Sequence, residues 1–492
     1  MLSGYGLKMF KVFHLIHKVK TFARQHWDVV LLTITLGSLL FVFNNKSYLA
    51  VYSLFVVFLF FRGFSLERSL FYSLLLALPF ERGLRAWHVP VVSPGPESWM
   101  YGYDVYFGIA IKYLVSLLLF LLLLITRSRR TTLDANSGLL LFFLFISTIS
   151  TLLAPKFGLA FLGFFRLIFF CLLFFEARYF FTTASIRRYY VNFLLALLFF
   201  LGGIGTLQLL HHQPLGLFLE DQFVNAPFGA FTNEGASVYR VTGLIGHPTF
   251  FGSFLSLLIP VAFGVLLDTL FFKKKRDTMN YFLPLSSVAF GILALFGTFS
   301  RSGWFASAFA LTLLVFVWLR KIHGKKVYLK LLIIPAMILV GVVFTFSALL
   351  ILRLQSFSYW WSLGSGRGRL LLIAQAMEMI KDFPLFGVGL NHFTLSMALH
   401  ELTPEARGFL YPVHNTVLLF ISELGIPAGL LFIIFVVQVF QNSWRISQKT
   451  WTKFGIWAGA STFLINSQFH TLFNQDPSFD MFVVMLAYLT IL

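Results

Sequence analysis

Six arginines lie at the ends of apolar stretches or in the long loops between them, in a chain that otherwise carries little charge: Arg240, Arg301, Arg353, Arg367, Arg369 and Arg407. A guanidinium group is planar and permanently charged, and it can bind two oxygens of one phosphate at the same time. Arg301 stands out because it lies in a tight turn, Phe299-Ser-Arg-Ser-Gly-Trp304, between two apolar runs. Such a gathering predicts a phosphate or pyrophosphate site, whereas a single arginine could equally extend along a membrane surface.

His414 is the side chain best suited to acid–base chemistry. It opens an apolar run in Tyr411-Pro-Val-His-Asn-Thr416, where Asn415 or Thr416 could cap a helix. Imidazole ordinarily has a pKa of about 6.5, so it can take a proton near neutral pH as a general base does. An anchor at the membrane surface is the alternative interpretation of the same histidine.

Three other residues are candidates for binding or support. His247, in Gly246-His-Pro-Thr249, also opens an apolar run, and we expect it to have a structural or substrate-positioning role. Arg166 and Lys112 lie within apolar runs. Charged groups inside a membrane are costly and by default suggest a functional cavity or a charged partner. The expected substrate-binding residues are therefore Arg240, Arg367, His247 and Arg166.

Patterns for metal binding are weak. The one cysteine, Cys171, lies inside an apolar run, which excludes a disulfide framework and a cysteine zinc site. The sequence has neither a Walker loop nor a histidine pair on one helix, and the nearest acidic pair in a long loop is Glu220-Asp221. Metal-dependent transferases of lipid-linked sugars need such carboxylates as ligands. We therefore expect metal-independent chemistry without a cofactor.

The composition of the chain indicates a membrane protein. Hydrophobic residues make up 58% of it and charged residues 12%, with a mean hydropathy of +0.83. A soluble domain carries about 25% charged residues. The formal charge of +19 does not indicate a nucleic-acid partner, because the basic residues form short clusters between apolar runs, as they do in cytoplasmic loops of membrane proteins.

A span requires about 20 apolar residues, and a scan with that window predicts an all-α polytopic membrane protein with about 12–14 transmembrane helices. One of the segments, 68–81, is short and could be re-entrant. The predicted segments are 27–43, 46–61, 68–81, 105–126, 137–153, 157–177, 189–210, 246–270, 281–299, 303–319, 328–350, 414–440, 453–470 and 477–492.

The positive-inside rule predicts the orientation. With the N-terminus in the cytoplasm, inner loops hold 25 Lys and Arg and outer loops 11. The long loops 82–104, 211–245 and 351–413 then face outward, on the side of the membrane away from the cytoplasm. We divide the chain into a basic cytoplasmic N-terminus (1–26), N-terminal helices (27–210), a core with two outer loops (211–440) and a C-terminal hairpin (441–492).

The outer loop 351–413 is predicted to be partly helical. Arg369 to Ile380 forms an amphipathic run of about three turns, and Phe383-Pro384 and Gly387-Val-Gly389 end it. This loop carries Arg369 and leads directly to His414.

Four segments in order resemble the O-antigen ligase and polymerase superfamily. Arg240-Val-Thr-Gly-Leu-Ile-Gly-His-Pro-Thr249 and Thr298-Phe-Ser-Arg-Ser-Gly303 are similar to its first two motifs. Gly368-Arg-Leu-Leu-Leu together with Met379-Ile-Lys-Asp-Phe-Pro-Leu-Phe-Gly-Val-Gly-Leu390 resembles its most recognisable stretch, and His414-Asn415 followed by Glu423-Leu-Gly-Ile-Pro427 is the fourth. Two positions depart from the family: Thr249 stands where Asn is usual, and Ile373 where Trp is frequent.

The resemblance implies a multi-pass protein of the bacterial inner (plasma) membrane, with the lipid bilayer as the surrounding medium. It would transfer a glycan, without metal, from an undecaprenyl-pyrophosphate-linked donor to an acceptor hydroxyl on a glycan, lipid A core or protein at the outer, periplasmic face. His414 would be the general base, and Arg301 and Arg369 would stabilise the departing pyrophosphate. A direct displacement of this kind inverts the anomeric centre. The close alternative is the polymerase of the same superfamily. A polysaccharide flippase or transporter and a metal-dependent glycosyltransferase are alternatives from other classes.

Overall fold

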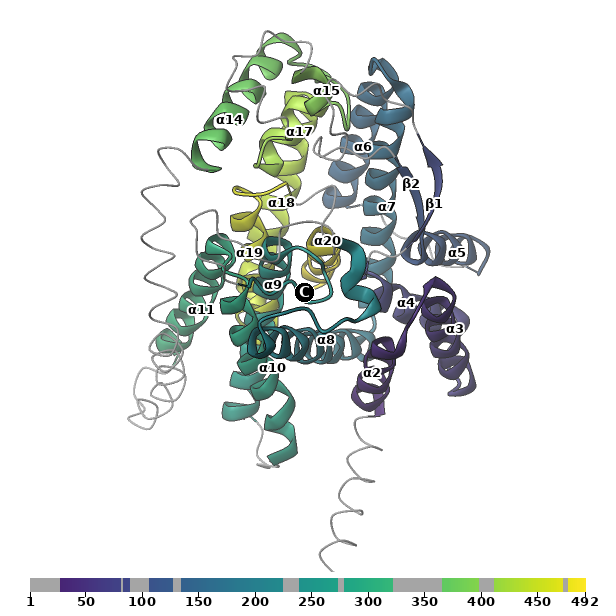
Figure 1. Cartoon of the computed structure of the whole chain (residues 1–492), viewed down its shortest axis with the longest axis vertical. Helices are drawn as coiled ribbons and strands as arrows, with labels where there is room; N and C mark the ends of the chain where they lie inside the picture. The colour runs from purple at the N-terminus through teal and green to yellow at the C-terminus, as the bar shows by residue number, and fades with distance from the viewer. Residues whose placement is uncertain are drawn as a thin grey trace, which may run out of the picture.

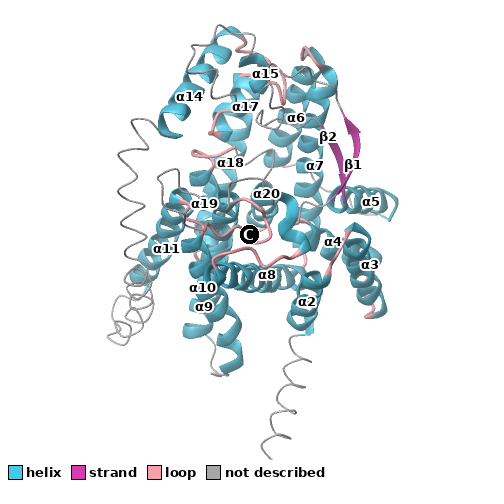
Figure 2. Cartoon of the chain, in the orientation of Figure 1, coloured by secondary structure: helices cyan, strands magenta, loops and turns pink. Residues whose placement is uncertain are grey.

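The computed structural model describes residues 27–80, 83–88, 106–126, 134–223, 239–272, 278–321, 365–397, 411–471 and 477–492, and helices dominate these parts of the chain (Figures 1 and 2). The predicted 328–350 span, Arg353 and Arg407 lie outside the described residues. The helical fold confirms the prediction of an all-α polytopic membrane protein.

Among the described residues, five helices are long and apolar enough to cross a membrane: α6 (Ala135–Leu153), α7 (Phe157–Phe181), α8 (Ala184–His211), α9 (Pro248–Phe272) and α18 (Ile426–Ser447). Five further apolar helices are shorter or contain a shorter apolar stretch: α3 (Asn45–Phe61), α5 (Ile111–Thr126), α10 (Thr278–Gly297), α11 (Arg301–Lys321) and α20 (Pro477–Leu489). The total of 12–14 spans stays a prediction.

The remaining elements lie outside these two groups of apolar helices. The helices are α2 (Trp27–Ser38), η1 (Leu39–Phe41), α4 (Leu66–Ala77), η3 (Phe218–Phe223), α14 (Ser365–Asp382), α15 (Phe393–Met397), α17 (Thr416–Leu424) and α19 (Trp451–Asn466). Two strands, β1 (Gly83–His88) and β2 (Tyr106–Ala110), pair antiparallel, and β2 leads directly into α5. In Figure 1, α14, α15 and α17 lie together at one end of the molecule.

Helices α9 and α19 pack with their backbones in contact. A Cβ added at Gly455 would lie 2.6 Å from the carbonyl oxygen of Pro260, and one at Gly459 would collide with the carbonyl oxygen of Leu257. Small residues permit this approach, which is how helices associate where lipid removes the hydrophobic driving force. The Asp268 carboxylate of α9 also accepts the N–H of Trp451, at 2.9 Å, and so caps the start of α19.

Buried polar pairs join helices that are distant in sequence. Lys112 of α5 donates to Asp480 of α20 at 2.7 Å, so a lysine for which the sequence offered no evident carboxylate has one in the fold. A charged group in a membrane is expected to have such a partner. Ser116, one turn further along α5, donates to Glu176 of α7 at 3.0 Å.

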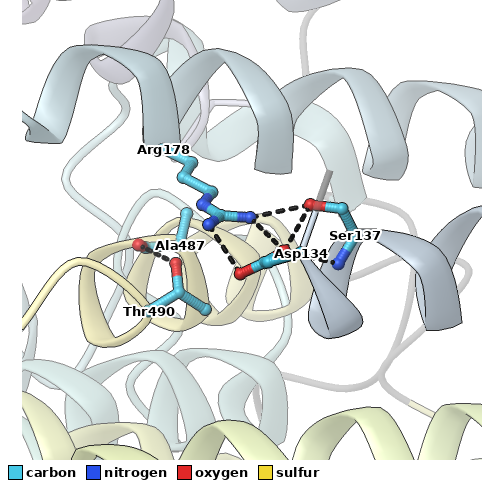
Figure 3. A network of polar contacts seen from close by, with 5 residues as sticks. All are labelled: Asp134, Ser137, Arg178, Ala487 and Thr490. Atoms are coloured by element: carbon cyan, nitrogen blue, oxygen red, sulfur yellow. Dashed lines mark hydrogen bonds and ion pairs between the residues drawn. The ribbon is translucent and has the colours of Figure 1, made fainter. Parts of the chain in front are cut away.

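A second ion pair lies at the C-terminal end of α7. Arg178 binds both carboxylate oxygens of Asp134, at 2.7 and 2.6 Å, and donates to Ser137 (Figure 3). Asp134 also caps α6 through the N–H of Ser137. Burial raises the pKa of Asp134, but the hydrogen bonds from Arg178 and Ser137 outweigh it and lower the pKa to about 2. This pair therefore contributes to stability above about pH 4 and loses its contribution as the pH falls toward 2.

The contact between α9 and α19 predicts the effect of one methyl group. Gly459→Ala should destabilise the protein by about 1–3 kcal/mol, the usual range for overpacking. Gly203→Ala is the matched control, because a Cβ at Gly203 of α8 meets nothing within 4 Å. The thermal unfolding midpoint in detergent should fall for Gly459→Ala and stay level or rise for the control. Equal midpoints would contradict the backbone contact.

Candidate functional site

Four of the predicted residues lie at or near the start of a helix. His247 directly precedes α9, Arg301 is the first residue of α11, Arg369 lies in the first turns of α14, and His414 precedes α17 by two residues. The N-terminus of a helix carries partial positive charge and unpaired N–H groups, which suit an anion. The sequence thus places basic side chains where the backbone itself favours phosphate.

His414 is held in one tautomer. Its Nδ1 lies 3.1 Å from the carbonyl oxygen of Pro412, and because a carbonyl can only accept, Nδ1 must carry the proton. Nε2 is then the basic nitrogen of the neutral ring. Asn415 caps α17 by accepting the N–H of Leu418 at 3.0 Å, as the sequence predicts, and this cap fixes the backbone beside the histidine.

The surroundings keep His414 neutral. Burial lowers its pKa and the charge of Arg369 lowers it further, to about 4, although the hydrogen bond to Pro412 acts in the opposite direction. A histidine with this pKa is unprotonated at pH 7 and so able to accept a proton. Burial also lowers the pKa of the Arg369 guanidinium, which nevertheless stays charged at neutral pH.

His247 belongs to the same group of side chains. Burial lowers its pKa to about 3, with further contributions from Arg240 and His414, so the electrostatic field of His414 reaches it. Its Nδ1 accepts the N–H of Thr249 at 3.2 Å. The imidazole therefore caps α9, and it does so at the place where the family's usual Asn is replaced by Thr249.

Arg240 is tied to the turn that carries Arg301. Its Nε donates to the carbonyl oxygen of Thr298 at 3.0 Å, and the neighbouring Val241 N–H donates to Gly297 at 2.8 Å. The turn needs a left-handed residue, since Phe299 has a φ of 52°. These contacts hold the segment that precedes α9 against the start of α11.

The other two predicted binding residues are Arg367 and Arg166. Arg367 is exposed on α14, while Arg369, two residues later, is largely covered. Arg166 lies half-buried within α7. The charge of Arg240 lowers the pKa of His247, and that of Arg369 lowers the pKa of His414. Both charges lower the pKa of a third histidine, His470.

His470 joins this cluster although sequence reasoning did not single it out. Its Nε2 lies 3.0 Å from the Oγ of Ser302, the residue after Arg301, and its ring centroid is 6.4 Å from that of His414. The sequence suggested a span over 453–470, but α19 ends at Asn466 and leaves His470 in a turn. The one sequence signal for His470 was that it borders an apolar run, as His247 and His414 do.

The segment 383–390, part of the stretch that most resembles the family, is bonded to the junction of α17 and α18. We call this backbone contact the clamp. After α14, Val388 and Gly389 donate their N–H groups to the carbonyl oxygens of Ser422 and Glu423, both at 2.9 Å. Gly425 crosses the same strip with a φ of 89° and touches the backbone of Leu385. This crossing breaks the single span predicted over 414–440 into α17 and α18.

The clamp is completed by two buried side chains. The Glu423 carboxylate accepts the N–H of Phe393 at 3.0 Å and so caps α15. The Nδ1 of His392 lies 2.6 Å from the carbonyl oxygen of Leu390, while Nε2 accepts the N–H of Lys156 at 3.1 Å. Burial lowers the pKa of His392, which keeps the ring neutral and its Nε2 able to accept.

Glu220, one residue of the acidic pair considered for metal binding, accepts hydrogen bonds from the neighbouring loop. Glu220 is buried, and its carboxylate accepts the N–H groups of Leu215 at 3.2 Å and Leu217 at 2.9 Å and a bond from Gln208. Gln208 in turn accepts the N–H of Gly243 at 2.8 Å. Glu220 therefore orders the loops around the site. Within the described part of the chain, no group of three or more His, Cys, Asp or Glu side chains is arranged to hold a metal ion.

The clamp predicts that Gly387→Ala displaces α14. Gly387 has a φ of 65°, and a Cβ there would meet the backbone of Glu423. Gly216→Ala is the matched control, because Gly216 has a φ of 73° and nothing within 4 Å of its Cβ. Backbone strain alone costs about 1 kcal/mol, so the control should lose that much and Gly387→Ala clearly more. Limited proteolysis should cleave α14 faster in Gly387→Ala only; equal rates would contradict the clamp.

A comparison with protein-family models supports the sequence resemblance. The model described as O-Antigen ligase matches residues 286–433, from within α10 to within α18. That segment holds Arg301, Arg369, His414 and the clamp. None of the curated proteins compared with the chain matches it significantly. Through residues 286–433, the chain is therefore similar to the O-antigen ligase family.

Proposed function

We propose that the protein is a metal-independent, inverting glycosyltransferase that moves a glycan from an undecaprenyl-pyrophosphate donor to an acceptor hydroxyl at the outer face of the inner membrane. The observation that carries this proposal is the pairing of a neutral His414 with the charge of Arg369. A base for the acceptor and a cation for the leaving group are the two groups that such a displacement needs.

In the proposed reaction, Nε2 of His414 takes the proton of the acceptor hydroxyl. The hydroxyl oxygen attacks the anomeric carbon of the donor sugar, and the bond from that carbon to the pyrophosphate oxygen breaks. Attack from the side opposite the leaving group inverts the anomeric centre. Undecaprenyl pyrophosphate departs with the bonding electron pair.

The departing pyrophosphate gains negative charge, and the arginines are positioned to offset it. Arg301 lies at the start of α11, where the helix dipole adds to its charge, and Arg240 is bonded to the preceding turn. Arg369 acts from α14. Preorganised cations in a largely covered site stabilise such charge more than water does, because they need no rearrangement during the reaction.

The site would serve equally for two reactions. A ligase attaches the glycan to its final acceptor, and a polymerase lengthens one lipid-linked glycan with another. We favour the ligase, because one large loop, 351–413, carries Arg369 and leads to His414. Glycan analysis in a deletion strain separates the two. Full-length glycan left on the lipid carrier indicates a ligase, and single repeat units indicate a polymerase.

His414→Ala and Arg369→Ala should each abolish attachment of surface glycan. Loss of a general base costs about 10²–10⁴-fold in rate, and loss of one charge-stabilising donor about 10²–10³-fold. Undecaprenyl-linked glycan should accumulate on the outer leaflet. Lys381→Ala, which removes an exposed cation from the last turn of α14, is the control and should behave as wild type. Normal attachment in either site variant would refute the site, and accumulation on the inner leaflet would favour a flippase.

The lowered pKa of His414 predicts an unusual pH dependence. Its base form is required, so purified enzyme should keep its transfer rate from pH 7 down to about 5 and lose it as the pH falls through about 4. Arg369→Gln removes a charge that lowers this pKa, and the acid limb of its residual activity should move upward. The measurement is transfer rate against pH with a lipid-linked donor. An acid limb near 6.5 in the wild type would speak against the arrangement of His414 and Arg369.

A further inference from the structure

The turn after α19 is fastened to the segment that carries His414. The N–H of Thr416 donates to the carbonyl oxygen of Ser467 at 2.8 Å, and its hydroxyl donates to the carbonyl oxygen of His470 at 3.2 Å. The side chain of Asn415 donates to Gln468 at 2.9 Å. Three bonds therefore fix the 467–470 turn against the two residues that follow His414.

The side chain of His470 reaches in the other direction, to the Arg301 turn. Its Nε2 is 3.0 Å from Ser302 Oγ, and that hydroxyl lies 3.3 Å from the hydroxyl of Ser300. His470 therefore has its backbone bonded to the His414 segment and its ring bonded to the Arg301 segment. These two segments hold the two proposed functional groups that must act on opposite sides of the transferred sugar.

The ring of His470 is electrically neutral in this position. Burial lowers its pKa well below the ordinary value, and four charged or chargeable groups on neighbouring elements add to the effect: Arg369, His414, His247 and Arg240. A protonated ring would be repelled by the two arginines, which carry charge at neutral pH. A neutral ring can fill the space beside His414, at 6.4 Å between centroids, without adding charge.

We propose that His470 is a positioning residue of the transfer reaction, a neutral imidazole that holds the Arg301 turn and His414 at a fixed separation and covers His414 from water. The proposal rests on the function proposed above. His470 lies outside the segment that the family model matches, residues 286–433. Bringing reactive groups into register can supply a large share of catalysis, and a misplacement of about 1 Å can cost about 100-fold.

The test compares His470→Ala with His470→Gln and Ser302→Ala in the full-length enzyme. His470→Ala should lower kcat about 10–100-fold with little change in the KM for the lipid-linked donor. The variant should also admit water beside His414, so the acid limb of the curve of transfer rate against pH should move upward, toward pH 6.5. The amide of His470→Gln can occupy the same space and bond to Ser302, so it should restore the acid limb and most of kcat.

Ser302→Ala separates the two parts of the role. It removes the bond to the Arg301 turn but leaves the ring over His414, so kcat should fall while the acid limb stays at its wild-type position. Thermal unfolding midpoints in detergent identify a variant that has merely lost its fold. A titration of His414 by histidine-specific NMR follows the same pKa without turnover, and it should rise in His470→Ala alone.

His414→Ala provides the reference that separates two kinds of failure. Full transfer in His414→Ala contradicts the proposed function itself. An inactive His414→Ala combined with wild-type kcat and an unchanged acid limb in His470→Ala overturns the positioning role alone. Equal losses in His470→Ala and His470→Gln, with no change in the His414 titration, overturn it as well.

Discussion

The arrangement of the site depends on the crossing of two backbone strips, one after α14 and one between α17 and α18. Val388 and Gly389 bond to the carbonyl groups of Ser422 and Glu423, and Gly425 leaves room for Leu385. The hydroxyl of Ser150 from α6 bonds to this crossing too, at 2.6 Å from the carbonyl oxygen of Phe386. Side chains at Gly387 or Gly425 would force the strips apart, and Arg369 would then lose its place beside His414.

The second constraint is electrostatic. The charges that act on the clustered histidines are positive, and the starts of α9, α11 and α17 add partial positive charge. Such a gathering of positive charge in a largely covered site favours the binding of an anion. The histidines respond by staying neutral, so the repulsion is confined to the arginines. A pyrophosphate offers oxygens to several guanidinium groups at once, and this is why we favour it over a single phosphate.

The sequence indicated the candidate residues because they lie where apolar runs begin. His247, Arg301 and His414 each fall within two residues of a helix start, and the chain breaks its hydropathy pattern there. Contacts between distant segments could not be found in this way. Lys112 and Asp480 are 368 positions apart, and nothing in either neighbourhood identifies the other. Glu423 lies in a segment that resembles the family, yet its role as the cap of α15 follows only from the fold.

Helix α19 is fastened at both of its ends. Asp268 caps its first residues, and the 467–470 turn binds the start of α17 at the other end. With 16 residues it spans about 24 Å, most of the thickness of a bilayer core. Such a helix is rigid, so the loop ahead of α19 and the histidine cluster at its other end move together. A displacement of Asp268, at the opposite end of α19 from His470, would therefore be transmitted along the helix to His470 and to the proposed reaction centre.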